Sequence, residues 1–282
     1  MAQARLGVLI IHGIGDDKGP IATRRGYSQG LQTKLRERDL TPAQVEFEEV
    51  YWHDHMQRRQ DRYWQGAEPR VRWDYVRKLI LNHLADASTY RQVPDQEDTV
   101  YARIHGEVHR SLTALEGRIA SDAPLVVMAH SLGAHIMSNY IWDRQRCRTP
   151  DPLGDTAFRR MERLVSMVSF GGNLPLFVMA ADPYEPITIP AATLPEPLRA
   201  LGRWFNYYDK DDVLGWPMAP LAEFVSEEHR SAFEAMVQDI PIDVGVPVLQ
   251  SSNPTSHVGY WKDRDFVGAV GEHLRGLLVA TA

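Results

Sequence analysis

Short apolar runs rich in Val and Ile recur along the chain, separated by longer stretches of mixed polarity. Runs of this length, apolar on both faces, are typical of buried strands in a parallel sheet that is covered by helices. We therefore expect strands at residues 6–11, 45–52, 125–130, 164–170, 204–208 and 244–249.

The stretches between these strands carry apolar residues at helical spacing. The clearest stripe consists of Val100, Ile104, Val108, Leu112 and Leu115, three or four residues apart, and it predicts a helix within 98–120. Further helices are expected at 22–38, 132–146 and 264–279. Strands and helices that alternate from start to end indicate an α/β domain with a mostly parallel sheet flanked by helices.

Two segments interrupt this alternation. Residues 54–95 are rich in arginine and aromatic residues and predict a helical insertion, whereas six prolines in 175–202 predict an irregular excursion over one end of the sheet. Both are longer than ordinary connections, which favours lid or binding-wall roles over plain surface decoration. We expect residues 1–282 to form a single domain, with 54–95 as a cap inserted in it.

Composition narrows the class of protein. The chain is 44% hydrophobic and 24% charged, as in soluble globular proteins, and its net charge of −6 argues against nucleic-acid binding, which requires a basic face. Cys147 is the only cysteine, so no intrachain disulfide is possible. The N-terminus lacks signal-peptide features and no apolar run approaches the ~20 residues of a membrane span. A cytoplasmic protein without stable membrane insertion is expected.

The stretch "VVMAHSLGAH" (126–135) places Ser131 between a predicted strand and a predicted helix. A serine on such a turn projects its hydroxyl above the sheet, and the crowded backbone requires small residues two positions before and after it. Ala129 and Gly133 meet this requirement, although glycine is commoner at the first position. Ser131 is therefore a candidate nucleophile, while Ser-x-Gly after an apolar run also arises by chance.

A second motif, "LIIHGIGDD", follows the first predicted strand. A nucleophilic serine needs two backbone N–H groups that stabilise the developing oxyanion. The candidates are Leu132, directly after the serine, and either Gly13 or Ile14 of this loop. A dinucleotide-binding loop is excluded, because Lys18 stands where the third glycine of G-x-G-x-x-G belongs.

An acid and a base are found further along the chain. In "WFNYYDKDDVLGWP" a predicted strand runs into three aspartates, and a carboxylate at this place can orient a histidine. We favour Asp211 as this acid, with Asp212 as the close alternative and Asp209 as a brace of the turn. His257, in the polar stretch "SSNPTSHVGYW", is the candidate general base.

Other histidines are less well placed. His130 adjoins the candidate serine, but on a strand its side chain should point away from it. The stretch "HGEVH", from His105 to His109, superficially suggests a metal-binding helix, yet its acid is not adjacent to the first histidine as in H-E-x-x-H. No metal site is expected.

Taken together, the order oxyanion loop, Ser131, Asp211, His257 resembles the α/β-hydrolase superfamily, in which the triad runs Ser…Asp…His. More narrowly, "HGIGDD", "AHSLGA", "SFGGNLPLF", "NYYDKDDVLGWP" and "SHVGYW" look like lipase-like serine esterases with an HGIG oxyanion loop, among them GPI inositol-deacylase-like and bacterial lipases. The resemblance covers nearly the whole chain. It implies an α/β-hydrolase fold with a central parallel sheet and a helical cap.

The resemblance also implies a chemistry. Ester cleavage would pass through an acyl-enzyme on Ser131, with no metal or organic cofactor. Gly172 and Asn173 would lie beside the pocket, and His12 of the HGIG loop is a further substrate-binding candidate. The expected partner is a small-molecule ester, acyl or lipid-like esters included. A thioesterase or acyltransferase with the same triad, and a non-catalytic binding module with a hydrolase fold, remain alternatives.

Overall fold

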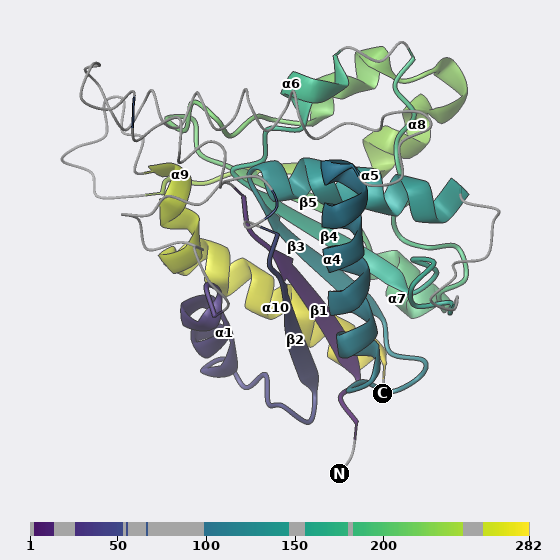
Figure 1. Cartoon of the computed structure of the whole chain (residues 1–282), viewed down its shortest axis with the longest axis vertical. Coiled ribbons are helices and arrows are strands. Elements are labelled where there is room, and N and C mark those ends of the chain that lie inside the picture. Colours follow the sequence, from purple (N-terminus) through teal and green to yellow (C-terminus); the bar gives the residue numbers. More distant parts are fainter. Residues whose placement is uncertain are drawn as a thin grey trace.

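A sheet of parallel strands forms the centre of the molecule (Figure 1). The computed structural model describes residues 3–13, 26–52, 55, 66, 99–146, 156–179, 183–244 and 256–281. The strands are β1 (Leu6–Ile11), β2 (Val45–Val50), β3 (Leu125–His130), β4 (Leu164–Phe170), β5 (Trp204–Tyr208) and β6 (Val237–Pro241). Their order in the sheet is β2-β1-β3-β4-β5-β6, and every neighbouring pair is parallel.

The first five strands were predicted from the apolar runs, and β2 ends two residues earlier than predicted. β6 was not predicted, because its sequence VQDIP has Gln238 and Asp239 side by side in its middle and ends in a proline. Both features suit an edge strand, which pairs on one side and is covered less completely. The run predicted as the sixth strand, 244–249, lies outside the described residues except for Val244, which is not part of a strand.

Helices cover both faces of the sheet. The four predicted helices correspond to α1 (Gln29–Arg36), α4 (Val100–Glu116), α5 (Leu132–Arg146) and α10 (Arg264–Ala280). Shorter ones are α6 (Pro175–Val178), α7 (Glu196–Leu201), η3 (Ala219–Phe224), α8 (Glu227–Met236), α9 (Ser256–Gly259) and η4 (Tyr260–Lys262). In Figure 1, α4 and α5 lie on one face, and α1 and α10 on the other.

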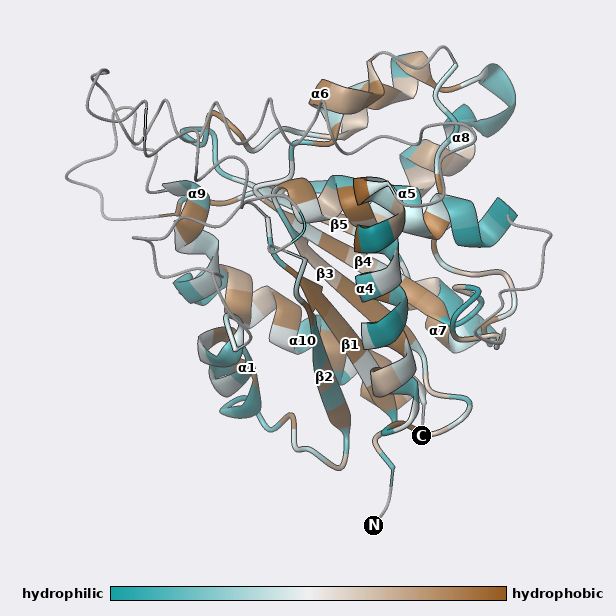
Figure 2. Cartoon of the chain, viewed as in Figure 1, coloured by the Kyte–Doolittle hydropathy of each residue, from teal (hydrophilic) through white to brown (hydrophobic). Residues whose placement is uncertain are grey.

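Two apolar layers explain why an inner strand such as β1 is apolar on both faces. Successive residues of a strand point to opposite faces, so Leu9 and Ile11 pack in the layer of α4 and α5, whereas Val8 and Ile10 pack in the layer of α1 and α10. Figure 2 shows the same arrangement, with hydrophobic strands inside and hydrophilic positions on the outer sides of the helices. The predicted α/β class is confirmed, and the topology fits the α/β-hydrolase fold.

The parallel strands bring their carboxyl ends to one edge of the sheet, where sites of open α/β proteins lie. The predicted excursion 175–202 contains α6 and α7, and the described residues 183–195 between them have irregular backbone. The predicted cap, 54–95, falls outside the described residues except for His55 and Gly66. In the part of the chain that the structure describes, no helix is both long and apolar enough to cross a membrane.

Candidate active site

The turn between β3 and α5 consists of a single residue, Ser131. Its φ of 52° lies in the left-handed region, which side chains other than glycine rarely adopt. The small neighbours are required by close packing: a Cβ on Gly133 would lie 2.7 Å from the carbonyl oxygen of His12, and Ala129 is fully buried. Strain of this kind at a polar residue is typical of functional sites.

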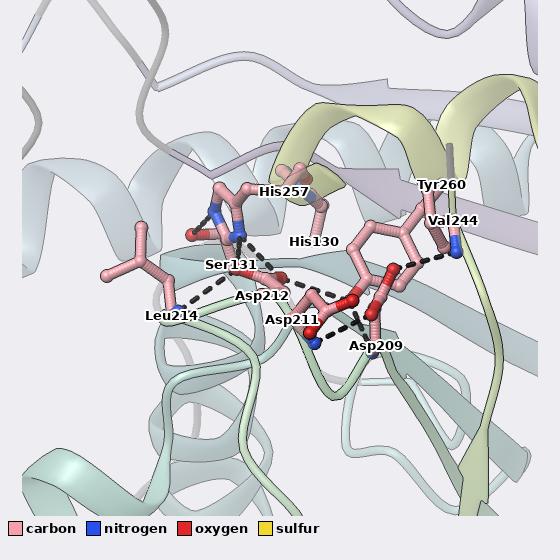
Figure 3. Close-up of polar contacts among 9 residues, drawn as sticks. All are labelled: His130, Ser131, Asp209, Asp211, Asp212, Leu214, Val244, His257 and Tyr260. Atoms are coloured by element: carbon pink, nitrogen blue, oxygen red, sulfur yellow. Dashed lines mark hydrogen bonds and ion pairs between the residues drawn. The ribbon is translucent and has the colours of Figure 1, made fainter. Parts of the chain in front are cut away.

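A chain of hydrogen bonds runs from this serine through His257 to Asp212 (Figure 3). His257 Nε2 lies 2.8 Å from Ser131 Oγ, and His257 Nδ1 lies 2.9 Å and 3.1 Å from the two carboxylate oxygens of Asp212. Because a carboxylate only accepts, Nδ1 carries the proton, and Nε2 of the neutral ring accepts the proton of the serine hydroxyl. All three side chains are at most 5% exposed.

The aspartate in this chain is Asp212, whereas the sequence interpretation favoured Asp211. Asp211 is exposed, and its backbone N–H donates to the Asp209 carboxylate over 2.8 Å. A tight turn, closed by a bond from the Asp212 N–H to the Asp209 carbonyl, points the Asp212 side chain inward. Counting positions after the strand could not reveal this orientation. Asp209 does brace the turn, since its other carboxylate oxygen accepts from the Val244 N–H over 2.7 Å.

The Asp212 carboxylate has two further donors besides His257. The Leu214 N–H donates to Oδ1 over 3.0 Å, and the Tyr260 hydroxyl donates to Oδ2 over 3.0 Å. Burial by itself raises the pKa of Asp212, but His257 and these two donors together hold it below its ordinary value. The carboxylate is therefore ionised at neutral pH and able to orient the histidine.

The predicted oxyanion donors lie beside the serine as far as the structure describes them. Leu132 is the first residue of α5, so its N–H has no partner in a preceding helical turn and lies at the positive end of the helix dipole. A Cβ on Gly13 would lie 2.4 Å from the Cβ of Ser131, so the Gly13 backbone packs directly against the serine. Ile14, the other candidate, lies outside the described residues.

His12, a further substrate-binding candidate, is fully buried, as Ser131 is. Its ring stacks on Trp52, with centroids 5.0 Å apart and planes 4° apart, and its Nδ1 donates to the Gly13 carbonyl over 2.5 Å. The Trp52 indole N–H in turn donates to the His12 carbonyl over 3.0 Å. These contacts hold His12 and Gly13 in place beside Ser131.

Gly172 and Asn173, the other substrate-binding candidates, follow the end of β4. The Gly172 carbonyl accepts from the Trp216 N–H over 2.9 Å, which joins this segment to the turn that carries Asp212. The Asn173 side chain is wholly buried, and neither its Nδ2 nor its Oδ1 has a hydrogen-bond partner among the residues the structure describes. Asn173 is thus the candidate with polar capacity left for a ligand.

Two residues that contact this group were not predicted. His130 does not point away from the site, because its Nε2 donates to the His257 carbonyl over 2.7 Å and the two rings are 4.8 Å apart. Burial, with His257 adding to it, holds the pKa of His130 well below its ordinary value, so the ring is neutral. Tyr260 lies three residues after His257, and this helical spacing was the available signal for it.

The histidines of "HGEVH" have separate partners. His105 Nδ1 lies 3.3 Å from an Asp143 carboxylate oxygen, and His109 Nδ1 lies 3.3 Å from the Tyr140 hydroxyl oxygen. The acid of the motif, Glu107, accepts from His55 over 2.8 Å. Within the described ranges, no three His, Cys, Asp or Glu residues are grouped so that they could hold a metal ion.

No protein-family model matches the sequence, and no curated protein matches it. Among solved structures, a hormone-sensitive lipase from a metagenome library is similar over 100% of this chain and 78% of its own length, with 11% sequence identity and a TM-score of 0.43. A similarity this distant carries no conclusion about activity, which has to be inferred from the geometry of the site.

Proposed function

We propose that this protein is a serine hydrolase that cleaves carboxylic esters, with Ser131, His257 and Asp212 as its catalytic triad. One observation carries the proposal: the continuous hydrogen-bond chain from Ser131 Oγ through both nitrogens of His257 to the Asp212 carboxylate. The strained φ of Ser131 at the end of β3 supports it, since that geometry is typical of a nucleophile elbow.

In the first half of the reaction, Ser131 Oγ attacks the ester carbonyl carbon while His257 Nε2 takes the serine proton. The resulting oxyanion would be stabilised by the Leu132 N–H and by the loop that contains Gly13. When the tetrahedral intermediate collapses, the bond to the alcohol oxygen breaks and that oxygen takes the proton from His257. An acyl-enzyme on Ser131 remains.

In the second half, a water molecule attacks the acyl carbon and gives its proton to His257 Nε2. Collapse of the second intermediate releases the carboxylic acid, and the proton returns to Ser131 Oγ. Asp212 stabilises the imidazolium in both halves and keeps the proton of the resting ring on Nδ1, which leaves Nε2 free to act as base.

Exposed apolar side chains support a substrate with an apolar acyl group. Val213 and Trp216 are 68% and 42% exposed on the turn after β5, and Leu176 and Met179 are 42% and 55% exposed at α6 after β4. The hydrogen bond between Trp216 and Gly172 joins these two segments. Large apolar side chains left in water on adjoining segments favour contact with an apolar ligand.

The test is hydrolysis of p-nitrophenyl esters of increasing acyl length by wild type and by Ser131→Ala. We expect turnover by the wild type and a loss of roughly 10³-fold or more in the variant. Ser138→Ala is the matched control, because it removes a different buried serine, one within α5, and should retain activity. Undiminished hydrolysis by Ser131→Ala, or none by the wild type at any acyl length, would overturn the proposal.

A further inference from the structure

The hydroxyl of Tyr260 lies between the two aspartates of the turn after β5 (Figure 3). It donates to Asp212 Oδ2 over 3.0 Å and accepts from the Asp209 backbone N–H over 2.8 Å. The side chain is 0% exposed. A phenol has one proton, and the Asp209 N–H occupies the accepting side of its oxygen, so that proton is directed at Asp212.

Tyr260 and His257 hold the same carboxylate from one short helical segment. Asp212 Oδ2 lies 2.9 Å from His257 Nδ1 and 3.0 Å from the Tyr260 hydroxyl oxygen, while Oδ1 is held by the Leu214 N–H. The carboxylate is therefore fixed from its own turn through Leu214 and from the opposite segment through Tyr260. Rotation of the carboxylate away from His257 would break both bonds.

We propose that Tyr260 is a positioning residue of this site: its hydroxyl fixes the Asp212 carboxylate and moderates the negative charge that His257 meets. The role rests on the proposed function, because it acts on the reaction only through Asp212 and His257. It also explains why a tyrosine, which buries a polar hydroxyl at a cost, stands beside the buried hydrogen bond between Asp212 and His257.

The charged and titratable groups around Tyr260 determine in which direction its hydroxyl changes the protonation of His257. It is faced by Asp212 and Asp209 from the turn after β5, by His257 from its own segment, and by His130 from the end of β3, with ring centroids 6.3 Å apart. Burial, and then the charge of Asp212, raise the pKa of Tyr260, so the phenol remains a donor. Without this donor the Asp212 carboxylate carries more negative charge beside His257, and it stabilises the imidazolium form of that ring more strongly.

Tyr260→Phe keeps the ring and removes the hydroxyl. For a p-nitrophenyl ester we expect kcat to fall about tenfold with KM nearly unchanged, because hydrogen bonds to charged groups are among the stronger ones. The acid limb of the kcat/KM profile should move to higher pH by about half a unit. Tyr101→Phe is the matched control, because it removes a hydroxyl that donates to Asp143 over 2.7 Å between α4 and α5. This variant should change neither kcat nor the acid limb of the profile.

A double-mutant cycle separates positioning from general packing. If Tyr260 acts through Asp212, Tyr260→Phe should cause little further loss in an Asp212→Asn background, measured in single turnovers with enzyme in excess. A loss of the same size in both backgrounds would show a purely structural role and overturn the inference.

A further variant at position 260 covers the case in which Tyr260→Phe does not fold. Site-specific 3-fluorotyrosine at position 260 keeps the ring and strengthens the donor, so the acid limb should move to lower pH. An unchanged profile would overturn the role of Tyr260 while leaving ester hydrolysis by Ser131 intact. Absence of Ser131-dependent hydrolysis in the wild type would instead overturn the proposed function, and this role with it.

Discussion

Asp211 and Asp212 are adjacent in the sequence but differ in environment, so they form a matched pair of variants. Asp212→Asn should lower kcat by roughly 10⁴-fold, because an amide in place of the carboxylate favours the wrong tautomer of His257. Asp211→Asn should leave kcat within about threefold of wild type, since this side chain is exposed and the effect of such changes is small. The measurement is ester turnover at neutral pH.

Which of the two variants loses more kcat decides which aspartate orients His257. A larger loss in Asp211→Asn would return the acid to the position that sequence spacing favoured. Equal and small losses in both variants would remove an orienting aspartate from the mechanism.

For single residues, the sequence could indicate the serine and the histidine but not the choice of acid. Ser131 stands between a continuous apolar strand and a helix, and His257 precedes the last helix, so both follow from element order. Which of two adjacent aspartates points inward depends on a turn of four residues closed by the Asp209 carbonyl and carboxylate. That turn has no periodic signal in the sequence.

For whole strands and helices, prediction succeeded where both faces of a strand are buried. β1, β3 and β4 are buried along their entire length, and their sequences are accordingly mostly apolar. β6 is half exposed and contains Gln238 and Asp239, so hydrophobicity alone did not distinguish it from a loop. The Asp239 carboxylate also accepts from the backbone of Met218 and Ala219, which gives this polar residue a structural role.

The packing of α10 on the sheet predicts a pH dependence of stability. His273 of α10 is partly buried, with Nε2 2.9 Å from Ser166 Oγ of β4 and its ring 4.7 Å from that of Phe205. Burial lowers the pKa of His273 to about 4. An unfolded histidine titrates near 6.5, so the unfolded chain binds more protons between these values and stability falls as the pH decreases through this window.

His273 should therefore lower the free energy of unfolding by about 1–2 kcal/mol when the pH decreases from 7 to 5. We expect His273→Gln to reduce the difference between the free energies of unfolding at those two pH values, measured by chemical denaturation. His229→Gln, which replaces an exposed histidine of α8, is the control. A difference as large in His273→Gln as in wild type would show that other groups dominate the acid sensitivity.

For the molecule as a whole, the parallel topology brings together residues that are far apart in the chain. Ser131 follows β3, Asp212 follows β5 and His257 begins the return to α10, and all three meet at the carboxyl edge of the sheet (Figures 1 and 3). The order of the three segments along the chain was sufficient to predict that they meet, but not that Asp212 rather than Asp211 faces His257. Cross-connections such as His130 to the His257 carbonyl and Tyr260 to Asp212 depend on packing between segments, which the sequence does not encode locally.

Covalent labelling with a fluorophosphonate, followed by peptide mapping, tests whether Ser131 is the nucleophile of an active serine hydrolase. Such probes react with a serine that is activated by a neighbouring base. We predict one adduct, on the peptide that contains Ser131, in the wild type and in Ser138→Ala, and none in Ser131→Ala. No adduct on the wild type, an adduct on another residue, or undiminished labelling of Ser131→Ala would contradict the proposed function.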